Sequence, residues 1–235
     1  MLGASGCGDD AGATGTGAVT VFAAASLTEP FTTIGKDFEA ANPGLTVRFN
    51  FAGSSALATQ INQGAPAHVF ASASPANMKA VTTDGTPETF VENQLVIAVP
   101  EANPSGVTGL ADLTKPGIKV ALCAEQVPCG AAAKKALEAA DVKLTPVTLE
   151  QDVKAALSKV KLGEVDAALV YRTDAKAAAS DVDGVEFPES AGAVNDYPIA
   201  VLKDAPNLTA AQAFVAYVQS DKGMAVLTAA GFQEP

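Results

Sequence analysis

The chain has 235 residues, of which 48% are hydrophobic, and a formal net charge of -11 at pH 7. This length allows a sizeable core, either in one compact unit or in two small lobes. The negative charge repels phosphate backbones, so nucleic acid is not expected as a partner, and with Arg48 and Arg172 as the only arginines no site built on an arginine clamp is expected.

The first residues resemble the end of a bacterial lipoprotein signal, because Cys7 follows a run of small residues. The charged and apolar parts of such a signal are missing. We expect residues 1–17 to form a tail and linker with a lipid on Cys7, so that the protein is extracytoplasmic, either anchored to the membrane or periplasmic. The alternative is a disordered tail with a free thiol. No apolar run approaches the ~20 residues that cross a bilayer.

Strands and helices then alternate. Apolar residues at helical spacing, Phe31, Ile34 and Phe38, indicate a helix that ends at the turn residues 42–44. The expected strands of this first unit are 19–25, 45–51, 68–72 and 94–99, the last within a stretch from 90 to 99, and the expected helices are 27–41, 56–64 and 76–81.

A second unit of the same type follows. Its expected strands are 119–122, 145–149 and 167–171, and its expected helices are 131–140, 153–162 and 173–180. A returning strand at 197–202 and two helices at 210–220 and 222–230 close the chain.

This alternation predicts an α/β fold with two lobes, each a mixed, mostly parallel sheet flanked by helices. We assign residues 18–97 and 198–235 to one lobe and 98–197 to the other, joined by crossing strands. Ligands of such sheets bind beyond the carboxyl ends of the strands, so a cleft between the lobes is the expected site.

Small hydrogen-bond donors recur where strands give way to helices, in the segments 25–27, 53–56, 127–130 and 151–153. The first turn of each helix has unpaired N–H groups and the positive end of a dipole, so several such ends pointing at one place would bind an anion. The Tyr171 hydroxyl would add a donor. At any one junction a serine is also an ordinary helix cap, and the recurrence in both units is what favours a site.

The segments 19–28 and 51–61 resemble the molybdate-binding proteins of bacterial ABC importers. The later segments 127–130, 151–153 and 169–171 occur in the family's order, and the likeness runs from Val19 to Phe232. It implies a periplasmic-binding-protein type II-like fold that closes on molybdate or tungstate.

The resemblance also implies the ligand set. Ser26 and Ser54 would donate hydroxyl and backbone N–H groups, Cys129 and Val153 would donate backbone N–H groups, and Tyr171 would donate its hydroxyl. The metal would be bound as an oxyanion, with no side chain coordinating it directly.

Two positions depart from the family pattern. Cys129 stands where a small, alanine-like residue is usual, and His68 stands where an acidic residue is common; we expect a structural or surface role for His68. Cys129 lies close to Cys123, and the two could form a disulfide in an oxidising compartment. The alternative is a pair of reduced thiols in a cytosolic protein.

Molybdate and tungstate carry two negative charges and no proton at neutral pH, so their site needs donors and no facing carboxylate. We therefore expect Asp152 to cap its helix and point away from the anion. Sulfate has the same charge, and its exclusion would depend on cavity size. We expect no cofactor, a membrane importer permease as partner, and a monomer. The alternatives are a binder of another tetrahedral oxyanion such as sulfate and, more remotely, an enzyme that uses Cys129 as a thiolate.

Overall fold

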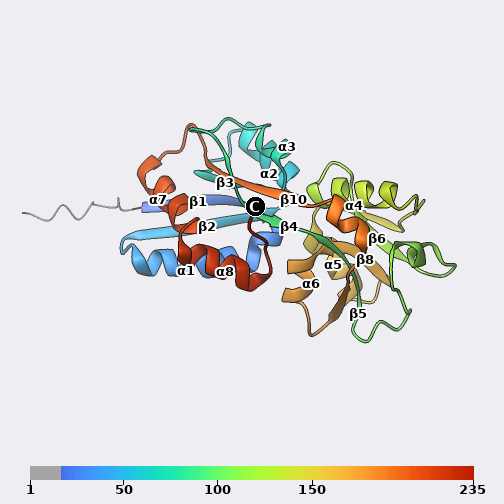
Figure 1. The fold of residues 1–235 in the computed structure, drawn as a ribbon. Coiled ribbons are helices and arrows are strands. Elements are labelled where there is room, and N and C mark those ends of the chain that lie inside the picture. Colours follow the sequence, from blue (N-terminus) through green and yellow to red (C-terminus); the bar gives the residue numbers. More distant parts are fainter. Residues whose placement is uncertain (1–16) are drawn as a thin grey trace, which may run out of the picture.

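The computed structural model describes residues 17–235, so Cys7 and the tail before residue 17 lie outside the described residues. Two lobes lie side by side, with β4, β5 and β10 running between them (Figure 1). Each lobe is a mixed five-stranded sheet flanked by helices, which confirms the predicted two-lobed α/β fold. Within the described part of the chain, none of the helices has the length and apolar character of a membrane span.

Lobe 1 has the strand order β2-β1-β3-β10-β4. Its strands are β1 (Gly17–Ala24), β2 (Leu45–Ala52), β3 (Val69–Ala71), β4 (Glu88–Asn93) and β10 (Asn195–Val201). Its helices are the 3-10 helix η1 (Ala25–Leu27), α1 (Thr28–Ala41), α2 (Ser54–Asn62), α3 (Pro75–Met78), α7 (Leu208–Val218) and α8 (Asp221–Ala230). β1 is parallel to β2 and β3, and β10 is antiparallel to β3 and β4.

Lobe 2 has the strand order β7-β6-β8-β5-β9. Its strands are β5 (Leu95–Pro100), β6 (Val120–Cys123), β7 (Thr148–Glu150), β8 (Ala167–Tyr171) and β9 (Val182–Val185). Its helices are α4 (Pro128–Ala139), α5 (Val153–Lys161), α6 (Arg172–Ala177) and the 3-10 helices η2 (Leu110–Thr114) and η3 (Pro188–Gly192). β6 is parallel to β7 and β8, whereas β5 is antiparallel to β8 and β9.

The two lobes have separate cores of different composition. In lobe 1 the helical stripe Phe31, Ile34 and Phe38 is fully buried against the sheet. Phe38 meets Phe214 of α7 edge to face, with ring centroids 5.3 Å apart. The core of lobe 2 consists mainly of valine, leucine and alanine. Each lobe therefore has its own hydrophobic stabilisation.

The chain changes sheets at a single residue, Gln94, because β4 ends at Asn93 and β5 begins at Leu95. It returns at the start of β10, at Asn195. The crossings predicted from the sequence lie at 97/98 and 197/198, inside the apolar strand β5 and inside β10. In the structure the first crossing lies at the polar run Glu92, Asn93 and Gln94, just before that apolar strand. Two side-chain hydrogen bonds hold the chain at the first crossing. Asn93 Nδ2 donates to Thr173 Oγ1 at 2.8 Å, and Gln94 Nε2 donates to Ser190 Oγ at 2.6 Å.

Two helices begin earlier than their apolar periodicity indicates. α2 begins at Ser54 rather than at residue 56, and α4 begins at Pro128 rather than at residue 131. A proline at the first helical position suits its fixed φ and absent N–H group. The earlier starts place Ser54 and Cys129 in the first helical turns, where backbone N–H groups have no partner within the helix.

Candidate functional site

A small pocket lies at the boundary between the lobes, with a cavity volume of about 20 Å³. A cavity of ~10–15 Å³ holds one water molecule, so this pocket accommodates a single small group. Its walls are Ala24, Ala25, Ser26, Ala52, Gly53, Ser54 and Ala73 from lobe 1, and Val127, Pro128, Cys129, Asp152, Val153 and Tyr171 from lobe 2. The structure thus brings all five residues of the expected ligand set to one place.

The two serines of lobe 1 are both buried, and each has a hydrogen-bonded neighbour. Ser26 Oγ lies 2.8 Å from the Tyr197 hydroxyl, and Ser54 Oγ accepts a bond from the Ala73 N–H group at 3.0 Å. Ser26 is in η1, directly after β1, and Ser54 is the first residue of α2. Tyr197, on β10, was not expected to take part in the site, because no local pattern links it to a serine 171 residues away.

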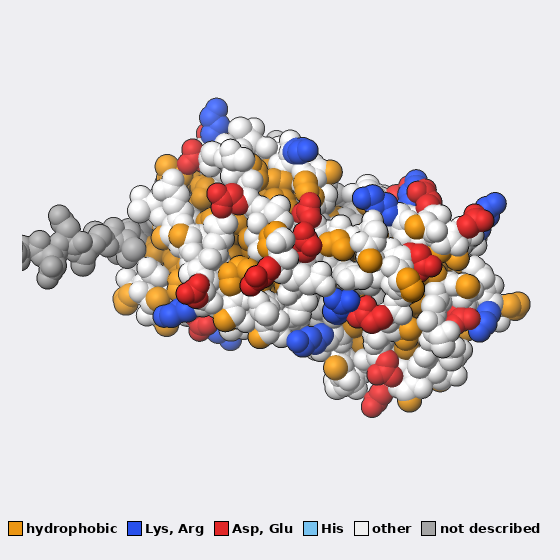
Figure 2. All heavy atoms as spheres, in the orientation of Figure 1, with side chains coloured by type: hydrophobic (Ala, Val, Ile, Leu, Met, Phe, Trp, Pro, Cys, Tyr) orange, Lys and Arg blue, Asp and Glu red, His pale blue; other side chains and the backbone are white. Residues whose placement is uncertain are grey.

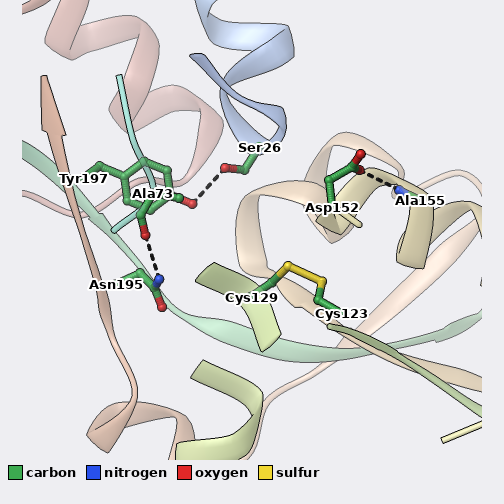
Figure 3. Close-up of a disulfide and its surroundings, with 8 residues drawn as sticks. All are labelled: Ser26, Ala73, Cys123, Cys129, Asp152, Ala155, Asn195 and Tyr197. Carbon is green, nitrogen blue, oxygen red and sulfur yellow. Dashed lines mark hydrogen bonds between the residues drawn. A yellow bond between two sulfur atoms is a disulfide. The ribbon is translucent and has the colours of Figure 1, made fainter. Parts of the chain in front are cut away.

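Two helices of lobe 2 begin at the pocket. Within residues 17–235, the backbone N–H groups of Cys129 and Val153 donate to no other part of the chain. Asp152 caps α5, since its carboxylate accepts from the Ala155 N–H group at 2.9 Å. Figure 3 shows this carboxylate directed at Ala155. The expectation that Asp152 caps its helix is confirmed, and the two N–H groups remain available to a ligand.

A disulfide joins Cys123 at the end of β6 to Cys129 in the first turn of α4 (Figure 3). The turn is tightly packed, because a Cβ atom on Gly130 would overlap the Ala124 carbonyl oxygen. Both features fix the position of the Cys129 N–H group. A cysteine held in a disulfide has no thiolate, so in this pairing Cys129 cannot act as the nucleophile of a cysteine-based enzyme.

Tyr171 ends β8 and contributes a fully buried hydroxyl to the pocket wall. This hydroxyl has no hydrogen-bond partner among residues 17–235. Burial raises the pKa of Tyr171 well above its usual value, and burial likewise raises the pKa of Tyr197. The two rings lie edge to face, with centroids 6.0 Å apart. Both hydroxyls therefore keep their protons at neutral pH and can act as donors.

Beside the pocket, Lys154 of α5 spans the two lobes. Its Nζ atom lies 2.8 Å from each carboxylate oxygen of Glu29 in α1 and 3.1 Å from Asp174 Oδ1 in α6. Burial raises the pKa of Asp174 to about 6, while the neighbouring lysine acts to lower it. Glu29 and Lys154 are 125 residues apart, so nothing local in the sequence indicated this contact.

The lobes are in close contact around the pocket. A Cβ atom on Gly53 of lobe 1 would overlap the carbonyl oxygen of Gln151 in lobe 2, so the absence of a side chain at Gly53 permits this approach. Together with the Lys154–Glu29 pair, this contact identifies the arrangement as a closed one.

His68 lies outside the pocket, as expected for a structural residue. It is 7% exposed, and its Nδ1 atom accepts from the Thr20 N–H group at 3.1 Å. On the face shown in Figure 2, acidic and basic side chains are scattered over both lobes. Among the residues that the structure describes, no three His, Cys, Asp or Glu residues are grouped to hold a metal ion.

Residues 19–233 match the family model of the bacterial extracellular solute-binding proteins. The chain is 46% identical over 225 residues to the molybdate-binding protein ModA of Mycobacterium tuberculosis, covering 94% of this chain and 86% of that protein.

The fold is shared with solved structures of other binding proteins. The periplasmic molybdate-binding protein of Azotobacter vinelandii has a TM-score of 0.77 at 20% identity and covers 92% of this chain and 99% of its own. The sulfate-binding protein SubI of Mycobacterium tuberculosis has a TM-score of 0.76 at 20% identity, covering 92% and 86%.

The matching family consists of solute-binding proteins that act outside the cytoplasm, so the prediction of a binding protein rather than an enzyme is confirmed. The chain belongs to the bacterial extracellular solute-binding protein family.

Proposed function

We propose that the protein captures molybdate or tungstate in the interlobe pocket and delivers it to a membrane ABC importer. The observation that carries this proposal is the convergence of hydrogen-bond donors from both lobes on one small cavity. Hydroxyl groups come from Ser26, Ser54 and Tyr171, and backbone N–H groups come from these serines and from Cys129 and Val153. The 46% identity to a molybdate-binding protein supports the same ligand.

The donors suit a dianion without a proton. No lysine or arginine lines the pocket in the described chain. The positive ends of η1, α2, α4 and α5 therefore supply the favourable field, as helix N-termini do for bound anions. Asp152 is the one acidic residue in the wall, and its carboxylate is engaged at the α5 cap. Fixed dipoles thus replace side-chain charges, and the site offers little to a ligand that must donate a proton.

Sulfate is the second candidate, because a sulfate-binding protein has nearly the same TM-score as a molybdate-binding one. Sulfate and molybdate both have the charge that the helix dipoles favour, so the pocket must distinguish these two anions by size. The smaller sulfate would leave some donors stretched, and each buried unsatisfied donor costs about 1–3 kcal/mol. Tungstate is nearly the size of molybdate, so we expect the two to bind alike.

Donors from both lobes complete the pocket only when the lobes meet. A ligand that contacts both lobes therefore stabilises the closed arrangement through contacts that an open form lacks. The importer permease would recognise the closed surface, and the protein would act as a monomer.

A lipid on Cys7 would hold the protein at the membrane. Measuring the intact mass of the native protein and of a Cys7→Ser variant tests this proposal.

Isothermal titration of the purified protein with molybdate, tungstate, sulfate and phosphate tests the ligand. We expect tight, similar binding of the first two and much weaker binding of the others. Ser54→Ala should weaken molybdate binding at least tenfold, because it removes a donor to a charged group. Ser55→Ala is the matched control, since Ser55 is the next residue and does not line the pocket. Equal binding of sulfate, or equal effects of the two variants, would contradict the proposal.

A further inference from the structure

We propose that β10 sets the direction of both serine hydroxyls, through Tyr197 and Asn195, and thereby restricts the site to oxyanions without a proton. The inference rests on the proposed function and adds two positioning residues to it. Neither residue lines the pocket. They are two apart on one strand, so their side chains leave β10 on the same face. Figure 3 shows Tyr197 directed at Ser26 and Asn195 directed at Ala73.

The first connection runs from Asn195 to Ser54. Asn195 Nδ2 donates to the Ala73 carbonyl oxygen at 2.7 Å, which holds the main chain between β3 and α3. The Ala73 N–H group in turn donates to Ser54 Oγ at 3.0 Å. A hydroxyl has one proton and two acceptor positions. With Ala73 occupying one acceptor position of Ser54, the hydroxyl proton is free to turn towards the pocket.

The second connection is direct. Tyr197 is fully buried, and its hydroxyl oxygen lies 2.8 Å from Ser26 Oγ. An anion in the pocket can only accept, so the Ser26 proton must point at it. The remaining proton of the pair belongs to Tyr197, which therefore donates to Ser26 Oγ. Burial raises the pKa of Tyr197, so that proton stays in place at neutral pH. A hydroxyl that accepts one bond donates a stronger one, because such chains polarise cooperatively.

These two connections make the serines donors to the ligand. Hydrogen phosphate carries a proton that needs an acceptor inside the pocket, and leaving it unpaired has the usual penalty of a buried donor. Molybdate and tungstate carry no such proton. Tyr197 would thus govern discrimination by proton content, whereas cavity size governs discrimination by radius.

Tyr197→Phe tests the inference, because it removes the hydroxyl and keeps the buried ring. Ser26 Oγ then loses its donor, and its hydroxyl can turn to accept. We expect molybdate affinity to fall about 3- to 10-fold, the effect of weakening one hydrogen bond. Affinity for phosphate at mildly alkaline pH, where its hydrogen phosphate form predominates, should stay level or rise. The molybdate-to-phosphate ratio should therefore shrink by at least the loss in molybdate affinity.

Tyr217→Phe is the matched control. Tyr217 is on α7, and its ring packs edge to face on Phe38 with centroids 5.6 Å apart, away from the pocket. This variant should leave both affinities unchanged. If Tyr197 had a merely structural role, Tyr197→Phe would lower the affinities for molybdate and phosphate equally and leave their ratio unchanged. That result would overturn the inference.

A double-mutant cycle tests the other connection. Asn195→Ala should weaken molybdate binding in the wild-type background and add little in a Ser54→Ala background, because Asn195 acts through Ser54. Full additivity would overturn this part. Failure of the wild type to bind molybdate would refute the proposed function instead, so the two failures can be told apart.

Discussion

Removing the Tyr171 hydroxyl should weaken ligand binding and raise the stability of the ligand-free protein. Tyr171→Phe removes this hydroxyl and keeps the buried ring. The ring is fully buried at the end of β8, and the hydroxyl has no hydrogen-bond partner within residues 17–235. A hydrogen bond to a charged group contributes about 1.5–3 kcal/mol. At about 1.4 kcal/mol for each factor of ten, the variant should bind molybdate roughly 10- to 100-fold more weakly.

The same variant should stabilise the ligand-free protein. An unpaired buried hydroxyl costs about 1–3 kcal/mol, and the lower end applies here because solvent reaches the pocket when the lobes open. A gain of about 1 kcal/mol corresponds to a rise of about 2–4 °C in Tm for a protein of this size.

Thermal unfolding with and without molybdate, together with isothermal titration, measures both quantities. The ligand-free Tm should rise while the increase in Tm caused by molybdate becomes smaller, since that increase follows the ratio of ligand concentration to Kd. Tyr217→Phe should change neither. A variant that binds molybdate as tightly as the wild type, or that is less stable without ligand, would refute the role given to this hydroxyl.

Three further predictions concern the interlobe ion pair, the disulfide and His68. Glu29→Gln should weaken molybdate binding up to about 5-fold, because it removes a partly exposed interlobe ion pair with Lys154 that contributes ~0.2–1 kcal/mol and is screened by salt. Titration with molybdate at low and at high salt measures this loss. An equal loss of affinity at both salt concentrations would argue against an ion pair. Replacing both Cys123 and Cys129 by alanine should lower the free energy of unfolding by about 2 kcal/mol, the value for so short a loop. Denaturant titrations measure this difference. An unchanged free energy of unfolding would mean that packing alone keeps the turn in place. Burial lowers the pKa of His68, so this histidine binds a proton more readily in the unfolded chain than in the folded one. The His68 contribution to the free energy of unfolding should be complete above about pH 6.5 and fall as the pH drops towards the folded pKa. His68→Asn should flatten this part of the pH profile of unfolding.

Much of the fold was predictable because it has local causes. The stripe Phe31, Ile34 and Phe38 marks a helix face, and β1 and β2 end where small residues begin a helix. These junctions also located the pocket, since strand-to-helix turns are where helix dipoles point at a ligand. Tyr171 could be found for the same reason, at the end of an apolar strand.

The remainder depends on contacts between distant parts of the chain. β4 and β5 belong to different sheets, but they follow one another with only Gln94 between them, and the sequence pattern does not say which sheet each strand joins. β9 was not predicted, because Asp183 and Gly184 interrupt its apolar pattern. The Ser26–Tyr197 bond joins residues 171 positions apart, and periodicity along the chain has no means of revealing it.

The position of β10 has a consequence for the order in which the molecule is made. All five strands of lobe 2 come from one uninterrupted segment, whereas the sheet of lobe 1 receives β10 between β3 and β4. A chain growing from its N-terminus therefore lacks β10, the strand that joins β4 to β1, β2 and β3, until residue 201 has been added. Lobe 2 can fold while synthesis continues, but the half of the pocket that contains Ser26 and Ser54 is finished last.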